Sequence, residues 1–251
     1  MKRIICLLLT TILVSFSAKA YMFEFAGIYY NSLNEHEVEV VPGPVGVGYS
    51  GNIVIPEVVS NGSGIFKVVS IGKKAFEKCV GLYSITIPKN VRTIDREAFH
   101  KCVNMQNVKL SSTVKLIDED AFNGCQSIKM LVISDSVETI CRGAFENCSD
   151  LQLVVIPHSV KKIERSAFQK CTNLLSVALS CDASKIESFV FADCDKLKSI
   201  TIPPSVKDVY ENAFANCSNL NSVIILNPLA TVSDLAFSNC INLKSIKKAN
   251  K

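Results

Sequence analysis

Cysteine is the residue type whose number and spacing in this sequence could most readily support chemistry. The chain has 11 cysteines, and eight of them recur every 23 residues: Cys79, Cys102, Cys125, Cys148, Cys171, Cys194, Cys217 and Cys240. Such residues could form disulfides or bind zinc as thiolates. However, there is no C-x-x-C pair, and His36, His100 and His158 occupy unrelated positions of the repeat. We therefore expect no metal site and no cofactor.

The spacing of the eight cysteines favours buried thiols over disulfides. Equivalent positions of stacked repeats point the same way, and their Cα atoms lie about 5 Å apart. That distance permits a disulfide, but parallel side chains make its dihedral angle awkward. Free thiols are also among the most readily buried side chains. One or more bridges is the alternative, although Cys141 and Cys181, about two repeats apart, are not expected to pair.

The remaining polar residues show no arrangement that predicts catalysis. Acidic residues such as Asp118, Glu119 and Asp120 fall at variable positions of the repeat, where a solvated rim explains them. The sequence contains no glycine-rich phosphate loop and no evident grouping of serine, histidine and aspartate. The sequence therefore predicts a protein that is not an enzyme, and a cluster of acids and histidines in the structure would be needed to reopen the question.

The element that positions these residues is an internal repeat of 23 residues. Its clearest marker is phenylalanine, at Phe76, Phe99, Phe122, Phe145, Phe168, Phe191, Phe214 and Phe237. Further apolar columns follow at 6, 9, 11, 15 and 18 residues after each phenylalanine, which gives the unit A-F-x-x-C-x-x-L-x-x-V-x-I-P-x-S-V-x-x-I. Because one unit cannot bury its own apolar face, the units must stack as a repeat solenoid.

The stretch L-x-x-V-x-I matches the core of leucine-rich repeats. Its β-branched residues alternate as in a strand, so we expect strands at 84–87 and equivalent positions, stacked about 4.8 Å apart in a parallel sheet. The spacing of A-F-x-x-C-x-x-L favours a short helical or 3₁₀ turn on the return side. The predicted fold is a leucine-rich-type, right-handed β/3₁₀ solenoid with an N-terminal β-hairpin cap.

Segments such as LYSITIPKNVRTIDREAF (82–99) and LKSITIPPSVKDVYENAF (197–214) carry a more specific resemblance. From about residue 65 to residue 251, the chain resembles the bacterial surface leucine-rich repeat proteins of the BspA type. This resemblance implies the solenoid fold and a role at the cell surface. It does not supply a ligand or a mode of attachment.

Residues 1–20 read as a secretory signal peptide. Lys2 and Arg3 precede a short apolar run, and Ala18 and Ala20 provide small residues before a cleavage site. The run is too short for a membrane anchor, which needs about 20 apolar residues. Cleavage would leave 24 basic against 23 acidic residues, a net charge of +1, so the basic pI does not imply a nucleic-acid partner. We expect an exported protein that is periplasmic, surface-bound or secreted and has no membrane span in its mature form.

Residues 21–64 lie outside the 23-residue phase and are predicted to form a β cap with an enlarged first repeat strand, followed by the solenoid at 65–251. Residues 25–33 and 38–41 alternate weakly around Asn34-Glu35, which suggests a hairpin. The first unit carries nine extra residues between Pro56 and Pro88. We expect this excess to form a second hairpin, and a β cap would cover the open end of the first coil.

Function is expected on the outward positions of the strands, 8 and 10 residues after each phenylalanine. Most are small or polar, but the middle repeats place an apolar group there, bordered by a lysine: Met130, Val132, Leu153, Val155 and Ala178, with Lys109. Clustered exposed apolar residues commonly mark a binding site. We expect a cell-envelope adhesion or protein-interaction module that binds a host or neighbouring-cell protein here. The alternative is a structural protein whose apolar patch forms a homodimer.

Overall fold

The computed structural model describes residues 23–46 and 48–250, which contain 21 strands and no helix. The strands are β1 (Phe23–Phe25), β2 (Ile28–Ser32), β3 (Glu37–Val41), β4 (Gly51–Val54), β5 (Val58–Ser60), β6 (Ile65–Ile71), β7 (Leu82–Thr86), β8 (Thr93–Ile94), β9 (Asn107–Lys109), β10 (Leu116–Ile117), β11 (Met130–Val132), β12 (Thr139–Ile140), β13 (Leu153–Ile156), β14 (Lys162–Ile163), β15 (Ser176–Leu179), β16 (Lys185–Ile186), β17 (Ser199–Ile202), β18 (Asp208–Val209), β19 (Ser222–Ile225), β20 (Thr231–Val232) and β21 (Ser245–Lys248). The predicted signal peptide, 1–20, lies outside the described residues.

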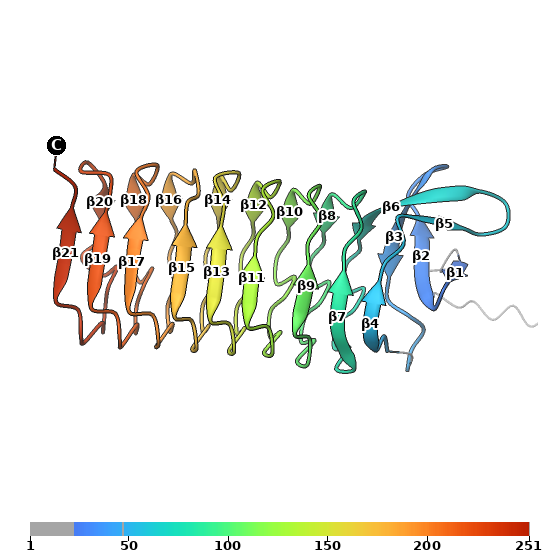
Figure 1. Cartoon of the computed structure of the whole chain (residues 1–251), viewed down its shortest axis with the longest axis horizontal. Helices are drawn as coiled ribbons and strands as arrows, with labels where there is room; N and C mark the ends of the chain where they lie inside the picture. The colour runs from blue at the N-terminus through green and yellow to red at the C-terminus, as the bar shows by residue number, and fades with distance from the viewer. Residues whose placement is uncertain (1–22, 47, 251) are drawn as a thin grey trace, which may run out of the picture.

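The chain winds into an elongated solenoid with strands on two opposite sides (Figure 1). One side, which we call the strand face, carries the odd-numbered strands β7 to β15, together with β4, β17, β19 and β21. The opposite side carries two-residue strands such as β8, β10 and β12. All pairings between coils from β7 onward are parallel, in steps of 23 residues, as in Met130↔Leu153↔Ser176. The predicted solenoid, its parallel stacking and its repeat length are confirmed.

The return side of each coil consists of two successive β-turns where the sequence favoured a short helical or 3₁₀ turn. In one coil the amide of Ala98 donates to Asp95 and the amide of Cys102 donates to Phe99. The third residues of these turns, Glu97 and Lys101, have φ of 58°, as a type II turn requires. This left-handed backbone directs their amides to the next coil, where Lys101 N–H reaches the Asn123 carbonyl at 2.7 Å. Stacking hydrogen bonds thus replace helical ones.

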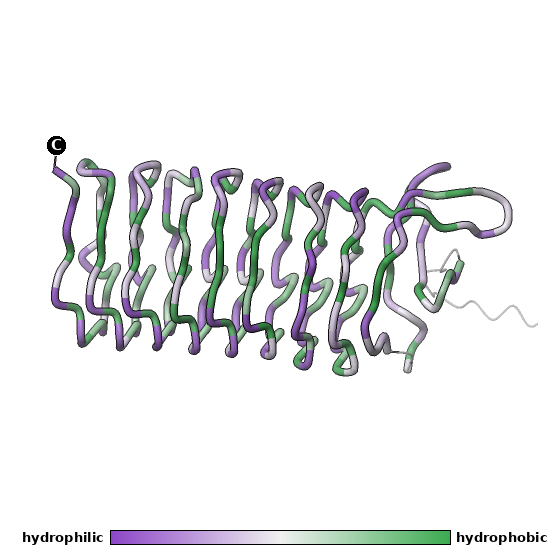
Figure 2. Tube along the Cα trace, viewed as in Figure 1, coloured by the Kyte–Doolittle hydropathy of each residue, from purple (hydrophilic) through white to green (hydrophobic). Residues whose placement is uncertain are grey.

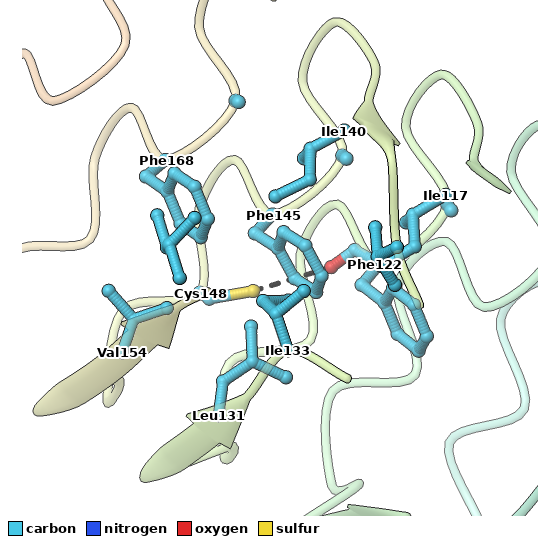
Figure 3. Packing of buried hydrophobic residues seen from close by; sticks show 14 of the residues in the cluster. Ile117, Phe122, Leu131, Ile133, Ile140, Phe145, Cys148, Val154 and Phe168 are labelled. Carbon is cyan, nitrogen blue, oxygen red and sulfur yellow. Dashed lines mark hydrogen bonds between the residues drawn. The ribbon is translucent and has the colours of Figure 1, made fainter. Parts of the chain in front are cut away.

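The interior is built from the phenylalanine and cysteine columns. The rings from Phe76 to Phe237 form one stack, with neighbouring centroids 4.9–5.5 Å apart and interplanar angles of 4–16°. Beside the stack, the Cys148 thiol donates a hydrogen bond to the Phe122 carbonyl at 3.4 Å (Figure 3). The ladder cysteines from Cys102 to Cys240 repeat this bond. The predicted ladder of buried thiols is confirmed.

The N-terminal strands cap the solenoid as expected. Strand β2 pairs antiparallel with both β1 and β3, which confirms the predicted hairpin around Asn34 and extends it by one strand. The extra residues of the first unit form the second hairpin, β5 with β6. Strand β4 pairs in parallel with β7, and Val54 lies opposite Thr86, so Pro56 corresponds to Pro88. The Tyr49 hydroxyl ties this region together by donating to Val41 O at 2.8 Å and accepting from Tyr29 N–H.

Hydrogen bonding on the strand face is interrupted twice. The face divides into the three-stranded sheets β4-β7-β9, β11-β13-β15 and β17-β19-β21. The second interruption, between β15 and β17, coincides with one on the opposite side, between β14 and β16. Here Cys181 is buried although it aligns with exposed His158, and Ala183 replaces the bulkier Val160.

Candidate functional site

The apolar residues predicted to form a binding surface lie together on the middle sheet of the strand face. Met130 pairs with Leu153, and Val132 pairs with Val155, which in turn pairs with Ala178. Met130 and Val132 are 61% and 56% exposed, while Leu153 and Val155 are partly exposed and Ala178 is exposed. We call these five residues the apolar patch. It occupies β11, β13 and β15 and therefore sits on one hydrogen-bonded unit.

The neighbouring sheets carry mostly polar outward residues. On β19, Ile224 is 43% exposed, but its partners in register are Thr201 and Lys247. Figure 2 shows the contrast as hydrophobic colouring along β11 and β13 against hydrophilic colouring along β21. The sixth predicted residue, Lys109, is exposed on β9, beyond the first interruption of the sheet. It therefore borders the patch instead of forming part of its sheet.

A shallow depression of about 470 Å³ adjoins the patch where β11 and β13 end. Val155 belongs to both features, and the other lining residues are Asp135, Ile156, Pro157, His158, Ser159 and Ser180. His158 Nδ1 lies 3.4 Å from Asp182 Oδ1, and both side chains are largely exposed. The sequence pattern did not predict this depression, because most of its lining residues follow the strands and lie outside the outward columns that predicted the patch.

Several charged residues on the turn side of the solenoid pair with one another within the chain. The carboxylate of Glu97 lies 2.8 Å from Lys74 Nζ and 3.0 Å from Arg96 Nε, and Glu119 continues the chain of ion pairs to Arg142. The hydrogen bond from Lys74, with Arg96 beside it, holds the pKa of the Glu97 carboxyl below its ordinary value. These pairs lie on the turn side of the solenoid, away from the patch.

The charged residues around the patch, in contrast, have few partners. Lys109, Lys129 and Asp135 form no ion pair in the part of the chain that the structure describes. Lys129 directly precedes Met130 at the start of β11, whereas Asp135 follows Val132 just past the end of that strand. Along the strands, the patch therefore has Lys129 at its start and Asp135 past its end, while Lys109 lies beside it in the column of Val132.

The Cys148 and Cys141 thiols are poorly suited to act as nucleophiles. Burial raises the pKa of the Cys148 thiol to about 12, so it carries no reactive thiolate near neutral pH. Cys141 is partly exposed, but desolvation and the nearby carboxylates of Glu164 and Asp118 raise its pKa to about 12 as well. Ionised, nucleophilic cysteines need the opposite surroundings, with cations nearby.

Within residues 23–46 and 48–250, no three histidine, cysteine or acidic side chains gather in a way that could hold a metal ion. In the same residues, no helix is long and apolar enough to cross a membrane. The His158–Asp182 pair has no serine or cysteine side chain hydrogen-bonded to His158 among the described residues, so it lacks the nucleophile of a catalytic triad.

The chain is similar to leucine-rich repeat proteins of bacteria. Residues 65–175 and 138–251 match the model of the BspA type leucine rich repeat region, with six copies. A leucine-rich repeat protein from Bacteroides ovatus superposes with a TM-score of 0.69 at 26% identity, over 91% of this chain and 71% of that protein. The T. pallidum leucine-rich repeat protein TpLRR gives 0.62 at 25% identity, over 86% and 88%. The pneumococcal vaccine antigen PcpA shares the fold, at 0.53 and 17% identity, over 90% and 69%. No curated protein sequence matches the chain.

Proposed function

The chain belongs to the BspA-type leucine-rich repeat family, and from this premise we propose that it is an exported, non-catalytic protein-interaction module of the cell envelope. In this role it binds a protein of a host or of a neighbouring cell, and adhesion is the consequence. The apolar patch is the binding surface. The observation that carries the proposal is that exposed Met130 and Val132 lie next to apolar partners on one sheet, whereas exposed apolar residues of the neighbouring sheets, such as Val54 and Ile224, have polar partners in register.

The exposed side chains of the apolar patch are unfavourably solvated, which favours their burial by a partner. Exposed apolar surface that is contiguous costs free energy in water, about 25 cal/mol per Å² of the area that a partner could cover. Because the patch lies on a hydrogen-bonded sheet over a close-packed interior, its backbone is held in place before a ligand arrives. Binding therefore needs little ordering of the protein, which reduces the entropic cost of association.

The sequence features of residues 1–20 support export, since a charged start, a short apolar run and small residues before Tyr21 are the elements of a signal peptide. The family of bacterial surface proteins to which the chain belongs supports the same conclusion. N-terminal sequencing of the protein recovered from outside the cytoplasm tests it. The expected result is a chain that begins at Tyr21, and an intact N-terminus on protein retained in the cytoplasm would refute export.

Substitution on the patch tests the binding surface. We expect Val132→Asp and Val155→Asp to abolish capture of the mature chain by whichever immobilised extracellular-matrix or envelope proteins bind the wild type. Ile224→Asp is the matched control, because Ile224 occupies the same column of the repeat and is similarly exposed, yet lies outside the patch. Circular dichroism verifies that each variant is folded. Equal binding by all variants refutes the patch as the binding surface.

Sedimentation of the mature chain distinguishes ligand binding by the patch from the alternative, a homodimer formed through the same patch. We expect a monomer at micromolar concentration, with the patch free for a ligand. A dimer that dissociates in Val132→Asp but not in Ile224→Asp would instead assign the patch to self-assembly.

A further inference from the structure

The depression beside His158 continues the apolar patch without a gap. Val155 contributes to both, and Ser180 lies one residue past the end of β15. A segment that covers Val132 and Val155 and extends in the direction of these strands must therefore place its next side chain at the depression. The chemistry of that depression then decides which side chain fits.

Asp135 is the acidic residue that lines the depression, and Asp182 lies outside the lining, next to His158. Asp135 has no ion-pair partner among the described residues, and Asp182 has only His158, at 3.4 Å. The buried Ser159 Oγ has no partner in the described chain either, although the equivalent Ser136 Oγ donates to Val114 O at 2.8 Å. The Ser159 hydroxyl is buried and out of a ligand's reach, so the unpaired Asp135 carboxylate is the acceptor for a ligand that brings hydrogen-bond donors and positive charge.

The opposite end of the patch has the opposite charge. Lys129 precedes β11 and supplies the positive charge at this end, whereas Lys109, in the same column as Val132, lies at the side of the patch across the first interruption of the sheet. Lys129 and Asp135 are six residues apart, which corresponds to at most about 20 Å of extended chain. The surface therefore has a polarity along the strands, basic at their start and acidic past their end.

From these observations we infer that the patch binds an extended protein segment of about six residues, whose apolar side chains are followed by a lysine or arginine that enters the depression. The inference rests on the proposed function and specifies the chemistry of its ligand. An acidic side chain at that end would face Asp135 and Asp182 and be repelled. Arginine fits particularly well, because its guanidinium offers five N–H donors to carboxylates in a planar fork.

Selection from a random library of displayed peptides on the immobilised mature chain tests the inference without a known ligand. We expect enrichment of peptides in which apolar residues are followed by lysine or arginine. Their synthetic forms should bind roughly two- to fivefold more weakly to Asp135→Asn and to Asp182→Asn, the range that exposed ion pairs give. The difference should shrink as salt rises from about 0.05 to 0.5 M. Asp234→Asn, an exposed acid on the turn side, is the control and should not change binding.

The outcomes separate this inference from the proposed function. Peptides that require Val132 and Val155 but show no basic preference, or that bind the Asp135→Asn and Asp182→Asn variants as well as the wild type, overturn the inference and leave the patch as a binding surface. Peptides that bind equally to Val132→Asp and Val155→Asp overturn both proposals. A library that yields no enriched peptide also overturns both, because an extended segment would then not be recognised.

Discussion

Removing one ring from the middle of the phenylalanine stack should destabilise the protein far more than removing the last ring. Phe145 is fully buried, and its ring lies 5.2 Å from those of Phe122 and Phe168, nearly parallel to both. Phe145→Ala deletes the ring and leaves a cavity between them, for which the cost is about 3–5 kcal/mol. That is a large part of the 5–15 kcal/mol or so that stabilises a typical domain.

Phe237 provides the internal comparison. It is only partly buried and stacks on one ring, Phe214, at 5.2 Å. Phe237→Ala therefore loses less transfer free energy and leaves an open notch instead of a cavity, so its cost should be about 1–2.5 kcal/mol. The chain has no tryptophan, so far-UV circular dichroism in increasing urea is the suitable assay, with the midpoint and the slope of each transition compared.

The slope of the free energy of unfolding against urea concentration reports whether the solenoid unfolds as one unit. In a stack where each coil contacts only its neighbours, a weak central coil lets the two halves unfold separately, which lowers the apparent slope for Phe145→Ala. A terminal defect should leave the slope unchanged. Equal losses of stability in the two variants, or a loss below about 1.5 kcal/mol for Phe145→Ala, would refute the claim that the continuous stack is the main stabilising element of the core.

Two further predictions concern the backbone and the thiols. Lys101 is exposed and held at φ 58°, a backbone conformation that costs a residue with a side chain about 1–2 kcal/mol, so Lys101→Gly should leave the free energy of unfolding in urea unchanged or raise it by up to about 1 kcal/mol. Lys207→Gly, at an exposed position with an ordinary φ, should instead lower it by about 0.5–1 kcal/mol. Equal losses of stability at the two sites would contradict the turn assignment. Burial raises the pKa of the Cys148 thiol from 9.0 to about 12 in the folded state, so the stability that this thiol contributes is complete below pH 9 and is lost as pH rises from 9 towards 12. Cys148→Val should therefore reduce the loss of stability at alkaline pH, which urea midpoints measured between pH 7 and 10.5 would report. An alkaline loss of the same size in the variant would show that other groups cause it.

The architecture could be predicted from the sequence because one periodic signal determines it. The phenylalanine and cysteine columns specify the repeat length, the stacking direction and the buried thiols without any knowledge of side-chain geometry. The turn conformation could not be read in the same way. Its left-handed positions hold Glu97, Lys101, Ser166 and Asn212, among others, and these residue types do not predict positive φ together. Hydrogen bonds between coils stabilise that backbone, and they exist only once the coils are stacked.

The strands of the opposite side were missed for a related reason. Val91 and Ile94 were recognised as apolar columns, but a spacing of three residues does not show the alternation of a strand. Only Thr93 and Ile94 are extended in that stretch, and parallel pairing with the adjacent coils makes them a strand. The patch residues could be identified because each outward position alternates with a buried one. The depression beside His158 depends on the path of the chain after the strand, which the repeat pattern does not determine.

The same regularity limits how the surface can be specific. Residues one repeat apart share a column and lie one strand spacing apart, so a ligand on the strand face meets rows of equivalent side chains at about 4.8 Å. A row of exposed valines, such as Val132 and Val155, offers affinity but poor discrimination between apolar ligands, because one methylene more or less changes binding by only about 1–3 kcal/mol. Discrimination must then come from where the rows end. Across the strands the row of Val132 ends at Lys109, and along the strands the patch runs from Lys129 to Asp135 and His158. A ligand chosen for its pattern of charges around an apolar centre is therefore what this scaffold is best able to distinguish.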